Sequence, residues 1–251
     1  MFIRSLRFGL AVLFALAIAG QAEAVTITWD FQSGSSTSST SSGSGYGNVY
    51  TFTANSVTAT VTAWGLTGSS GTTFQTAEVA RTLYGLGSCN QGEGVGCTGA
   101  SQRVDNVSQL EFLLFQFSAP VNLKQIVIDP GGTAFDRDVS YWIGNLSGSL
   151  NGIGLSGLAG LGLGTRLDLP NTSGSSTITL SLTGNNVTSL LFGTQAALTT
   201  TTAENDRFYV RSLIDDVPAA VPEPGTLVLL AAGLLAMGLR GRQRLIRRNS
   251  N

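Results

Sequence analysis

Three aspartates in one short stretch are the residues best suited to hold a metal ion. Asp129 precedes a Pro-Gly-Gly turn at 130–132, and Asp136 and Asp138 follow that turn two positions apart. In a loop these carboxylates can converge, and a ligand set made only of oxygens suits calcium. On a regular strand Asp136 and Asp138 would share one face, and Arg137 would supply a counter-charge. The pattern therefore leaves two interpretations open, a calcium site and a solvated strand edge.

Catalytic chemistry has little support in the composition. The chain of 251 residues contains no histidine, the commonest general base and transition-metal ligand, so zinc, copper and Ser-His-Asp chemistry are nearly excluded. Paired carboxylates could serve a glycosidase, but only at a separation of roughly 5 to 9.5 Å, which a sequence does not reveal. We therefore expect a protein that is not an enzyme, and a secreted hydrolase is a less favoured alternative.

Four aromatic residues could stack on sugar rings, namely Trp64, Tyr84, Tyr141 and Trp142. Aromatic side chains in β-proteins more often belong to the core. Tyr141 and Trp142 are adjacent, so on a strand they point to opposite faces and one of them should face solvent. A carbohydrate-binding module, assisted by calcium, is therefore the second hypothesis for this chain.

Short strands are the elements that must position these residues. Apolar residues alternate with threonine and other polar residues, while threonine, valine and glycine disfavour helices. Turns are expected at Ala119-Pro120, 130–132 and 184–186. The expected strands are 25–32, 49–54, 56–64, 73–81, 110–118, 121–129, 138–143, 176–182, 187–192 and 207–214. This pattern predicts one all-β domain over residues 25–220, an antiparallel sandwich or jelly roll.

Two segments of low complexity interrupt the strand pattern. Residues 33–47 are nearly all serine, threonine and glycine and are expected to form a flexible loop. Residues 144–164 are rich in glycine, with leucine and isoleucine between the glycines. No lysine follows that would complete a phosphate-binding loop, so this segment is expected to be a flexible or bulged connection between strands.

The N-terminus has the order of a secretory signal peptide. Arg4 and Arg7 precede an apolar run at 8–19, and the small residues Ala22 and Ala24 then mark a cleavage site. A helix of that length falls well short of the ~30 Å hydrocarbon core of a membrane. We therefore expect residues 1–24 to be removed as a signal helix during export.

The C-terminus also contains an apolar segment that is short for a membrane span. Val221-Pro222-Glu223-Pro224 is followed by an apolar segment at 226–239, expected to be a short transmembrane helix, and then by five arginines up to Arg248. Positive charge stays on the cytoplasmic side, so the preceding domain should lie across the membrane. This order over 221–251 resembles the PEP-CTERM sorting signal. The resemblance implies processing by an exosortase after transient contact with the inner membrane, in Gram-negative bacteria that make extracellular polysaccharide.

A second resemblance lies in the middle of the chain. Its motifs are Tyr84-Gly85-Leu86-Gly87-Ser88-Cys89-Asn90, Arg103-Val104-Asp105-Asn106, Glu111-Phe112-Leu113-Leu114-Phe115-Gln116-Phe117 and Asp136-Arg137-Asp138-Val139-Ser140. Together they resemble exosortase-dependent surface proteins. The resemblance implies a secreted, β-rich surface protein and carries no catalytic residue with it.

Cysteine content and charge agree with export. Cys89 and Cys97 are the only cysteines, and such a pair in an oxidising compartment predicts a disulfide across a loop that contains Gly92, Gly94 and Gly96. Without its two ends the chain keeps seven basic and thirteen acidic residues, a net charge of −6. Nucleic acid is therefore not an expected partner.

These observations favour a structural or interaction protein of the bacterial cell surface or the extracellular biofilm matrix. The expected partners are the exosortase and, for a carbohydrate-binding module, the exopolysaccharide of the cell.

Overall fold

The computed structural model describes residues 24–32, 38–41, 45–68, 71–107, 109–170, 173–195 and 206–217, together with Gly233. Residues Val25–Pro218 form one compact unit, called the body below, and residues 1–24 and 219–251 form a second unit. The expected signal peptide and sorting helix fall in the second unit, outside the described residues except for Ala24 and Gly233. Among the described residues, no helix is long and apolar enough to cross a membrane.

The described part of the body consists of strands and two short 3-10 helices. The strands are β1 (Val25–Asp30), β2 (Ser38–Ser41), β3 (Tyr50–Ala54), β4 (Val57–Gly68), β5 (Thr73–Thr82), β6 (Gly85–Cys89), β7 (Val104–Asp105), β8 (Glu111–Asp129), β9 (Val139–Gly144), β10 (Leu167–Leu169), β11 (Ile178–Thr194) and β12 (Arg207–Val217), and the helices are η1 (Gly99–Gln102) and η2 (Leu155–Leu161). The all-β prediction is confirmed, and the sandwich or jelly-roll arrangement stays a prediction.

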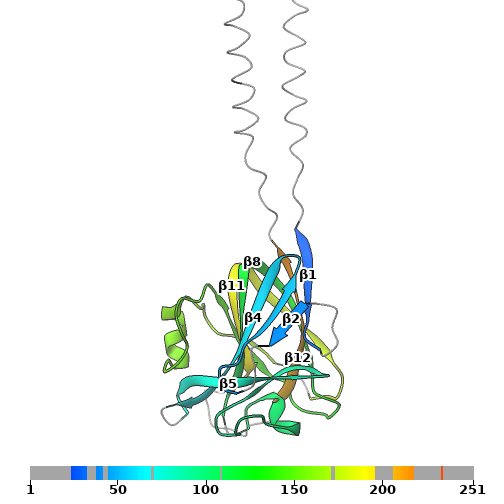
Figure 1. The fold of residues 1–251 in the computed structure, drawn as a ribbon, viewed down its shortest axis with the longest axis vertical. Coiled ribbons are helices and arrows are strands. Elements are labelled where there is room, and N and C mark those ends of the chain that lie inside the picture. Colours follow the sequence, from blue (N-terminus) through cyan, green and yellow to red (C-terminus); the bar gives the residue numbers. More distant parts are fainter. Residues whose placement is uncertain are drawn as a thin grey trace, which may run out of the picture. The chain divides into compact units, whose positions relative to one another are not determined.

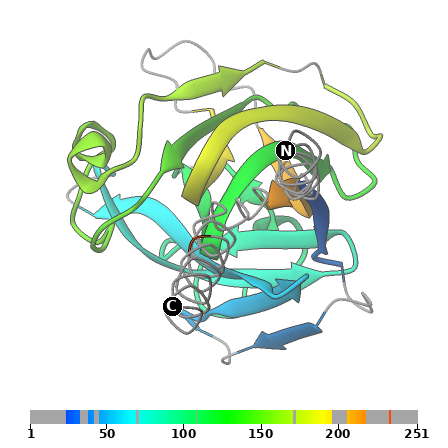
Figure 2. The same ribbon diagram turned by 90° about the horizontal axis from the view of Figure 1, so that it is seen from above.

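Strand β8 organises the sheet (Figure 1). One edge of β8 pairs with β11 along its length, while the other edge pairs first with β4 and then with β12. The pairings continue from β12 through β6 and β5 back to β4, so these five strands form a closed ring of hydrogen-bonded neighbours. Strands β9 and β10 extend the sheet beyond β11, and the strong curvature of the long strands is visible from above in Figure 2.

Two expected turns are wrong, because long strands pass through them. Strand β8 continues through Ala119-Pro120, where its partner changes from β4 to β12. Strand β11 continues through 184–186, where irregular register and a left-handed Asn186 mark β-bulges. Proline and asparagine therefore bend these strands without ending them, as bulges do in strongly curved sheets.

The serine-rich segment 33–47 also differs in part from the expected flexible loop. Ser38–Ser41 form β2, which pairs with β3, and residues 45–47 lie in a turn. Backbone hydrogen bonds to a sheet edge do not require large apolar side chains, so serine and threonine suffice there. Residues 33–37 and 42–44 lie outside the described part of the chain.

The inner face of the sheet carries the larger core. Along β4 the residues Val57, Ala59, Val61 and Ala63 are buried, and the threonines between them are partly exposed, as the alternating sequence predicts. Phe31 lies against Phe52 and Phe115, with ring centroids 4.8 and 5.5 Å away. Strands far apart in the sequence therefore meet in one apolar cluster.

A second apolar cluster lies on the outer face and explains the glycine- and leucine-rich segment 144–164. Leu150, Leu158 and Leu163 of this segment are buried in one cluster with Trp64 and Trp142. The segment, which includes η2 at the left of Figure 2, thus covers part of the outer face with its buried leucines and is more than a connection between strands. Its presence also corrects the expectation for Tyr141 and Trp142, because both are buried, one in each core cluster.

Candidate functional site

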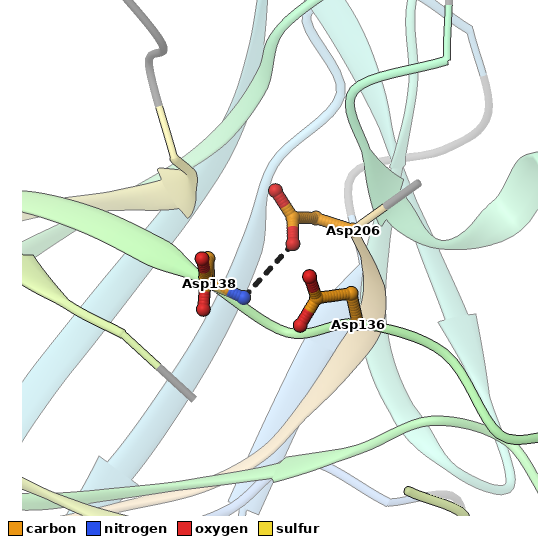
Figure 3. A group of neighbouring side chains, drawn as sticks. All are labelled: Asp136, Asp138 and Asp206. Carbon is orange, nitrogen blue, oxygen red and sulfur yellow. Dashed lines mark hydrogen bonds between the residues drawn. The ribbon is translucent and has the colours of Figure 1, made fainter. Parts of the chain in front are cut away.

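Three carboxylates gather where the loop between β8 and β9 meets the start of β12 (Figure 3). Asp136 and Asp138 come from the loop, and Asp206 comes from the residue before β12. One oxygen of each side chain can be chosen so that all three oxygens lie within 4.8 Å of one another. The expected convergence of Asp136 and Asp138 therefore occurs, and it includes a third residue that the sequence analysis missed.

Backbone hydrogen bonds fix this aspartate cluster, defined as Asp136, Asp138 and Asp206. The N–H of Asp138 donates to Oδ1 of Asp206 at 2.9 Å, and the N–H of Arg207 donates to the carbonyl of Asp136 at 3.0 Å. Asn106 adds a two-way link, because its Nδ2 donates to Oδ2 of Asp206 at 2.8 Å and its Oδ1 accepts from the N–H of Asp206 at 3.0 Å. Asp206 is thus held by residues that are distant in the sequence, Asn106 and Asp138, and Asp136 is linked through its carbonyl to the start of β12.

The chemistry of such a cluster is that of a hard cation. Carboxylates this close repel one another, and a cation placed between them would remove that repulsion. Calcium takes six to eight oxygen ligands, so the three aspartates could provide only part of its shell, with backbone carbonyls and water providing the rest. Asp206 is only 3% exposed, whereas Asp136 and Asp138 are partly exposed, so a cation would approach from the loop side.

Asp129, the third predicted calcium ligand, lies in a different set of contacts. Its Oδ1 accepts from the N–H of Gly131 at 2.8 Å, which closes the Pro-Gly-Gly turn, and its Oδ2 accepts from Oγ1 of Thr177 at 3.0 Å. Nη1 of Arg211 lies 3.6 Å from the same oxygen. These contacts make Asp129 an anchor of the loop that carries the aspartate cluster.

Arginine and aromatic side chains hold the same loop on its other side. The guanidinium of Arg103 lies 4.9 Å from the ring of Phe135 and 5.4 Å from the ring of Tyr209, and Arg207 lies 5.2 Å from Phe135. The guanidinium of Arg137 donates to the carbonyl of Ser176, and burial lowers the pKa of Arg137. Cation–π contacts of this kind stabilise by about 0.5–1 kcal/mol each at partly exposed sites.

A second acidic group lies beside the disulfide. Cys89 and Cys97 are bonded, with Cα atoms 6.0 Å apart, which confirms the predicted pair. The loop they close places Asn90 and Glu93 against Glu111, the first residue of β8. Asp105 of β7 also contacts Glu111 through its backbone N–H, so Glu93, Asp105 and Glu111 form a second group of acidic side chains.

Hydrogen bonds converge on Glu111, which is completely buried. Its Oε1 accepts from the N–H of Asn90 at 2.8 Å and from Nδ2 of Asn90 at 2.9 Å, and its Oε2 accepts from the N–H of Asp105 at 3.1 Å. Burial raises the pKa of Glu111 well above its usual value, and the charges of Asp105 and Glu93 raise it further. Burial also raises the pKa of Asp105 to about 6 and the pKa of Glu93 above its usual range.

Asp215 of β12 is a buried carboxyl of another kind. It lies opposite Ile27 of β1 and Leu123 of β8, with an exposed fraction of 0%. Within the described residues neither of its oxygens has a well-aligned hydrogen-bond partner, although the backbone of Lys124 is close enough to favour the ionised form. Burial raises the pKa of Asp215 to about 8.

The predicted sugar-stacking residues are mostly core residues. Trp64, Tyr141 and Trp142 are buried, and Tyr84 is partly exposed and stacks on Tyr209 with centroids 5.6 Å apart. Trp142 also lines an open hollow of about 390 Å³. The other residues that line this hollow are Leu155, Ser156, Leu158, Ala159, Gly164, Thr165 and Arg166.

Comparison with known proteins gives a match at the C-terminus. The description of the matching family is PEP-CTERM protein-sorting motif, and the match covers residues 220–243. The chain carries a PEP-CTERM sorting motif. No curated protein and no solved structure matches the chain.

The PEP-CTERM motif contains the predicted sorting residues Val221, Pro222, Glu223 and Pro224, the apolar segment 226–239, and the first two arginines of the tail. It implies export through the secretory pathway to the cell envelope or surface of a bacterium, with an exosortase as the processing partner. Apart from Gly233 these residues lie outside the described part of the chain, as does Ala22 of the predicted signal cleavage site, while Ala24 is described and exposed.

Proposed function

We propose that this chain is a structural or interaction protein of the bacterial cell surface or biofilm matrix, released from its C-terminal tail by an exosortase. The PEP-CTERM motif at 220–243 is the observation that carries the proposal. The body ends before this motif begins, so cutting the tail would leave all described strands intact. The disulfide adds support, because structural disulfides persist in oxidising, exported environments.

The proposal does not include catalysis. Histidine is absent from the chain, and Glu111, whose pKa is raised by burial, is completely buried, where a substrate would have no access. Its hydrogen bonds run to Asn90 and Asp105, which are parts of the scaffold. These contacts are those of a structural polar network.

The test is the intact mass of protein recovered from the surface or medium of the producing bacterium. We expect a mass that lacks residues 240–251 and the signal peptide, and a mass that retains residues 240–251 when the exosortase gene is deleted. Replacing Pro222, Glu223 and Pro224 by alanine should have the same effect as the deletion. The exposed substitution Asp168→Asn in the body is the matched control and should leave processing unchanged. Recovery of residues 240–251 from the surface of cells with an active exosortase would contradict the proposal.

A calcium-assisted carbohydrate-binding module is the second candidate, favoured by the aspartate cluster. The exopolysaccharide of the producing cell would be the ligand, and calcium held by Asp136, Asp138 and Asp206 would order the loop before β9. The test is binding of the exported protein to that polysaccharide with calcium and with a chelator. Binding that is lost with the chelator and in Asp206→Asn supports this candidate, and binding that is equal in all cases removes calcium from it.

A further inference from the structure

The disulfide loop, residues 90–96, is attached to the body through acidic side chains. The N–H of Asn90 lies between two carboxylates, 2.8 Å from Oε1 of Glu111 and 3.2 Å from Oε2 of Glu93. Both glutamates therefore approach the same donor, which brings their two carboxyl groups close together. A hydrogen bond between two carboxyl groups requires one proton, because two carboxylates have no donor.

The surroundings of this pair favour keeping that proton. Glu111 is completely buried and Glu93 is partly buried, so the cost of placing two negative charges side by side is high. Burial raises the pKa of both groups above the usual value of 4.5. The other charged groups around the pair are Asp105 of β7, Arg103 next to it, Arg207 of β12 and Glu78 of β5.

The rest of the loop can rearrange without disturbing the fold. Gly92, Gly94 and Gly96 are exposed, and Val95 is 61% exposed. Gly94 and Gly96 have φ values of 89° and 68°, which glycine adopts without strain, and apart from the adjoining residues no atom lies within 4 Å of the place where a Cβ would stand at either position. The bond between Cys89 and Cys97 holds both ends of the loop, so movement would be confined to the residues between them.

We propose that a proton held between Glu93 and Glu111 closes the disulfide loop onto β8, and that loss of this proton opens the loop reversibly while the body stays folded. In the closed state the shared proton joins the loop to the first residue of β8. Without it the two carboxylates repel, and Glu93, which is the less buried partner, moves to solvent with its segment of the loop. The remaining contacts hold the two sides of the loop: Asn90 stays bonded to Glu111, Gln91 Nε2 donates to the carbonyl of Thr76 at 3.0 Å, Tyr46 Oη donates to the carbonyl of Gln91 at 3.4 Å, and the N–H of Gly96 donates to Glu78 at 2.7 Å.

The direction of the pH response follows from the raised pKa values of the two glutamates. A group that binds its proton more tightly in the closed state favours that state at low pH and loses the effect as pH rises through the raised pKa. The closed loop should therefore persist at pH 5 and open at more alkaline pH. The conformational change would give an exported protein a surface loop that depends on the acidity of its surroundings.

Hydrogen exchange of the exported protein, with the disulfide verified by mass, tests the proposal. Protection factors corrected for intrinsic rates are compared at pH 5 and pH 8 for a peptide that covers residues 90–98. We expect protection to fall about tenfold or more in the native protein, one decade for each 1.36 kcal/mol lost, while peptides from β8 and β11 stay protected. Equal protection at both pH values would overturn the proposal.

Two variants distinguish opening of the loop by loss of the shared proton from a general loss of protection at high pH. In Glu93→Gln the amide can donate to the Glu111 carboxylate without a shared proton, so protection should no longer depend on pH. In Glu93→Ala the contact is absent, so protection should be low at both pH values, and Asp168→Asn should behave like the native protein. If protection in Glu93→Gln falls between pH 5 and pH 8 by as much as it does in the native protein, the proposal is contradicted. Carbon NMR of the native protein gives an independent measurement, and titration of both glutamates as single groups near pH 4.5 contradicts it also.

Discussion

Glu93, Asp105 and Glu111 form one group of acidic side chains, and Asp136, Asp138 and Asp206 form another. The two groups are neighbours, because Asp105 pairs with Arg207 in the β7–β12 ladder and Asn106 bonds to Asp206. In the first group Glu111 is enclosed by Asn90 and the β7 backbone, and burial raises its pKa, so the group favours binding a proton. In the second group two of the three carboxylates reach solvent, so a dissolved cation can balance them.

The difference between the groups shows how burial selects the counter-ion. Desolvation penalises a charged carboxylate, and protonation removes the charge where no cation can enter. At a partly exposed site a divalent cation with its own water molecules can reach the carboxylates and join them. Asp215 is a third case, a single buried carboxyl with no well-aligned partner among the described residues, for which only a proton is available.

Asp215 should give the largest effect of pH on stability. Its pKa is raised to about 8 by burial, so the folded protein holds a proton that the unfolded chain has already lost above about pH 4. The free energy of unfolding should therefore decrease as pH rises from about 4 to 8, with a limiting slope of about 1.4 kcal/mol per pH unit. Asp215→Asn removes this titration, so its stability should decrease less steeply over that range and exceed that of the native protein at pH 8, while Asp105 and Glu111 account for the decrease that remains. Urea unfolding at pH 4, 6 and 8 measures the difference.

Asp216 is the matched control for this prediction. It follows Asp215 in β12 but is bonded to Lys124 and Thr26, which lower the pKa of Asp216. A lowered pKa contributes stability that is lost only as pH falls below the ordinary range of aspartate. Asp216→Asn should therefore keep the decrease between pH 4 and 8, and a flat profile in this variant would show that Asp215 is not its source.

Glu111→Ala should give the next largest effect, at a fixed pH of 5. The substitution leaves Nδ2 of Asn90 and the N–H of Asp105 without their acceptor, while the N–H of Asn90 keeps only its longer bond to Oε2 of Glu93. Unsatisfied buried donors cost about 1–3 kcal/mol each, and part of this cost is relieved by water in the new space, so we expect a loss of about 3 kcal/mol. Glu111→Gln retains one acceptor oxygen and should lose less. Equal stability of all three proteins in urea unfolding would show that this network is not structural.

Calcium should have a smaller effect, acting through the second group. A ligand that binds only the folded state stabilises it by about 2.7 kcal/mol at a hundredfold excess over its dissociation constant. We expect the melting temperature of chelated protein to rise by several degrees at millimolar calcium. Asp206→Asn, Asp136→Ala and Asp138→Ala should each remove this rise, because each takes one carboxylate from the cluster. A native melting temperature that calcium leaves unchanged contradicts the calcium site.

The strands could largely be predicted from the sequence, since alternation between apolar residues and threonine is a local signal. Val57 to Ala63 in β4 show this clearly, as every second residue there is buried. The full length of β8 and β11 could not be predicted, because Pro120 and the Asn185-Asn186 pair are residues typical of turns. Only the pairing with neighbouring strands shows that they lie at irregularities inside continuous strands. The cover formed by residues 144–164 was missed for a similar reason, since its spaced leucines have no regular period.

The two acidic groups could be predicted from the sequence to different degrees, because each is completed by residues that are distant in the sequence. Asp136 and Asp138 were predicted as a pair because they are close in sequence, whereas Asp206 is 68 residues beyond Asp138 and joins them only through the start of β12. Its sole local signal was its position directly before a predicted strand. Glu111 begins an ordinary apolar strand segment, so its complete burial and its contact with the disulfide loop follow only from the folded arrangement.

Asp129 provides the smallest expected effect and the sharpest comparison with Asp206. Both are aspartates of low exposure near the same loop, and the sequence favoured Asp129 as the ligand. In the fold Asp129 bonds to Gly131 and Thr177, whereas Asp206 bonds to Asp138 and shares the cluster. Asp129→Asn retains an oxygen acceptor for Gly131, so the rise in melting temperature on adding calcium should remain nearly native, while Asp206→Asn loses it. If calcium fails to stabilise Asp129→Asn and still stabilises Asp206→Asn, the ion is bound at the turn before the loop and not by the aspartate cluster.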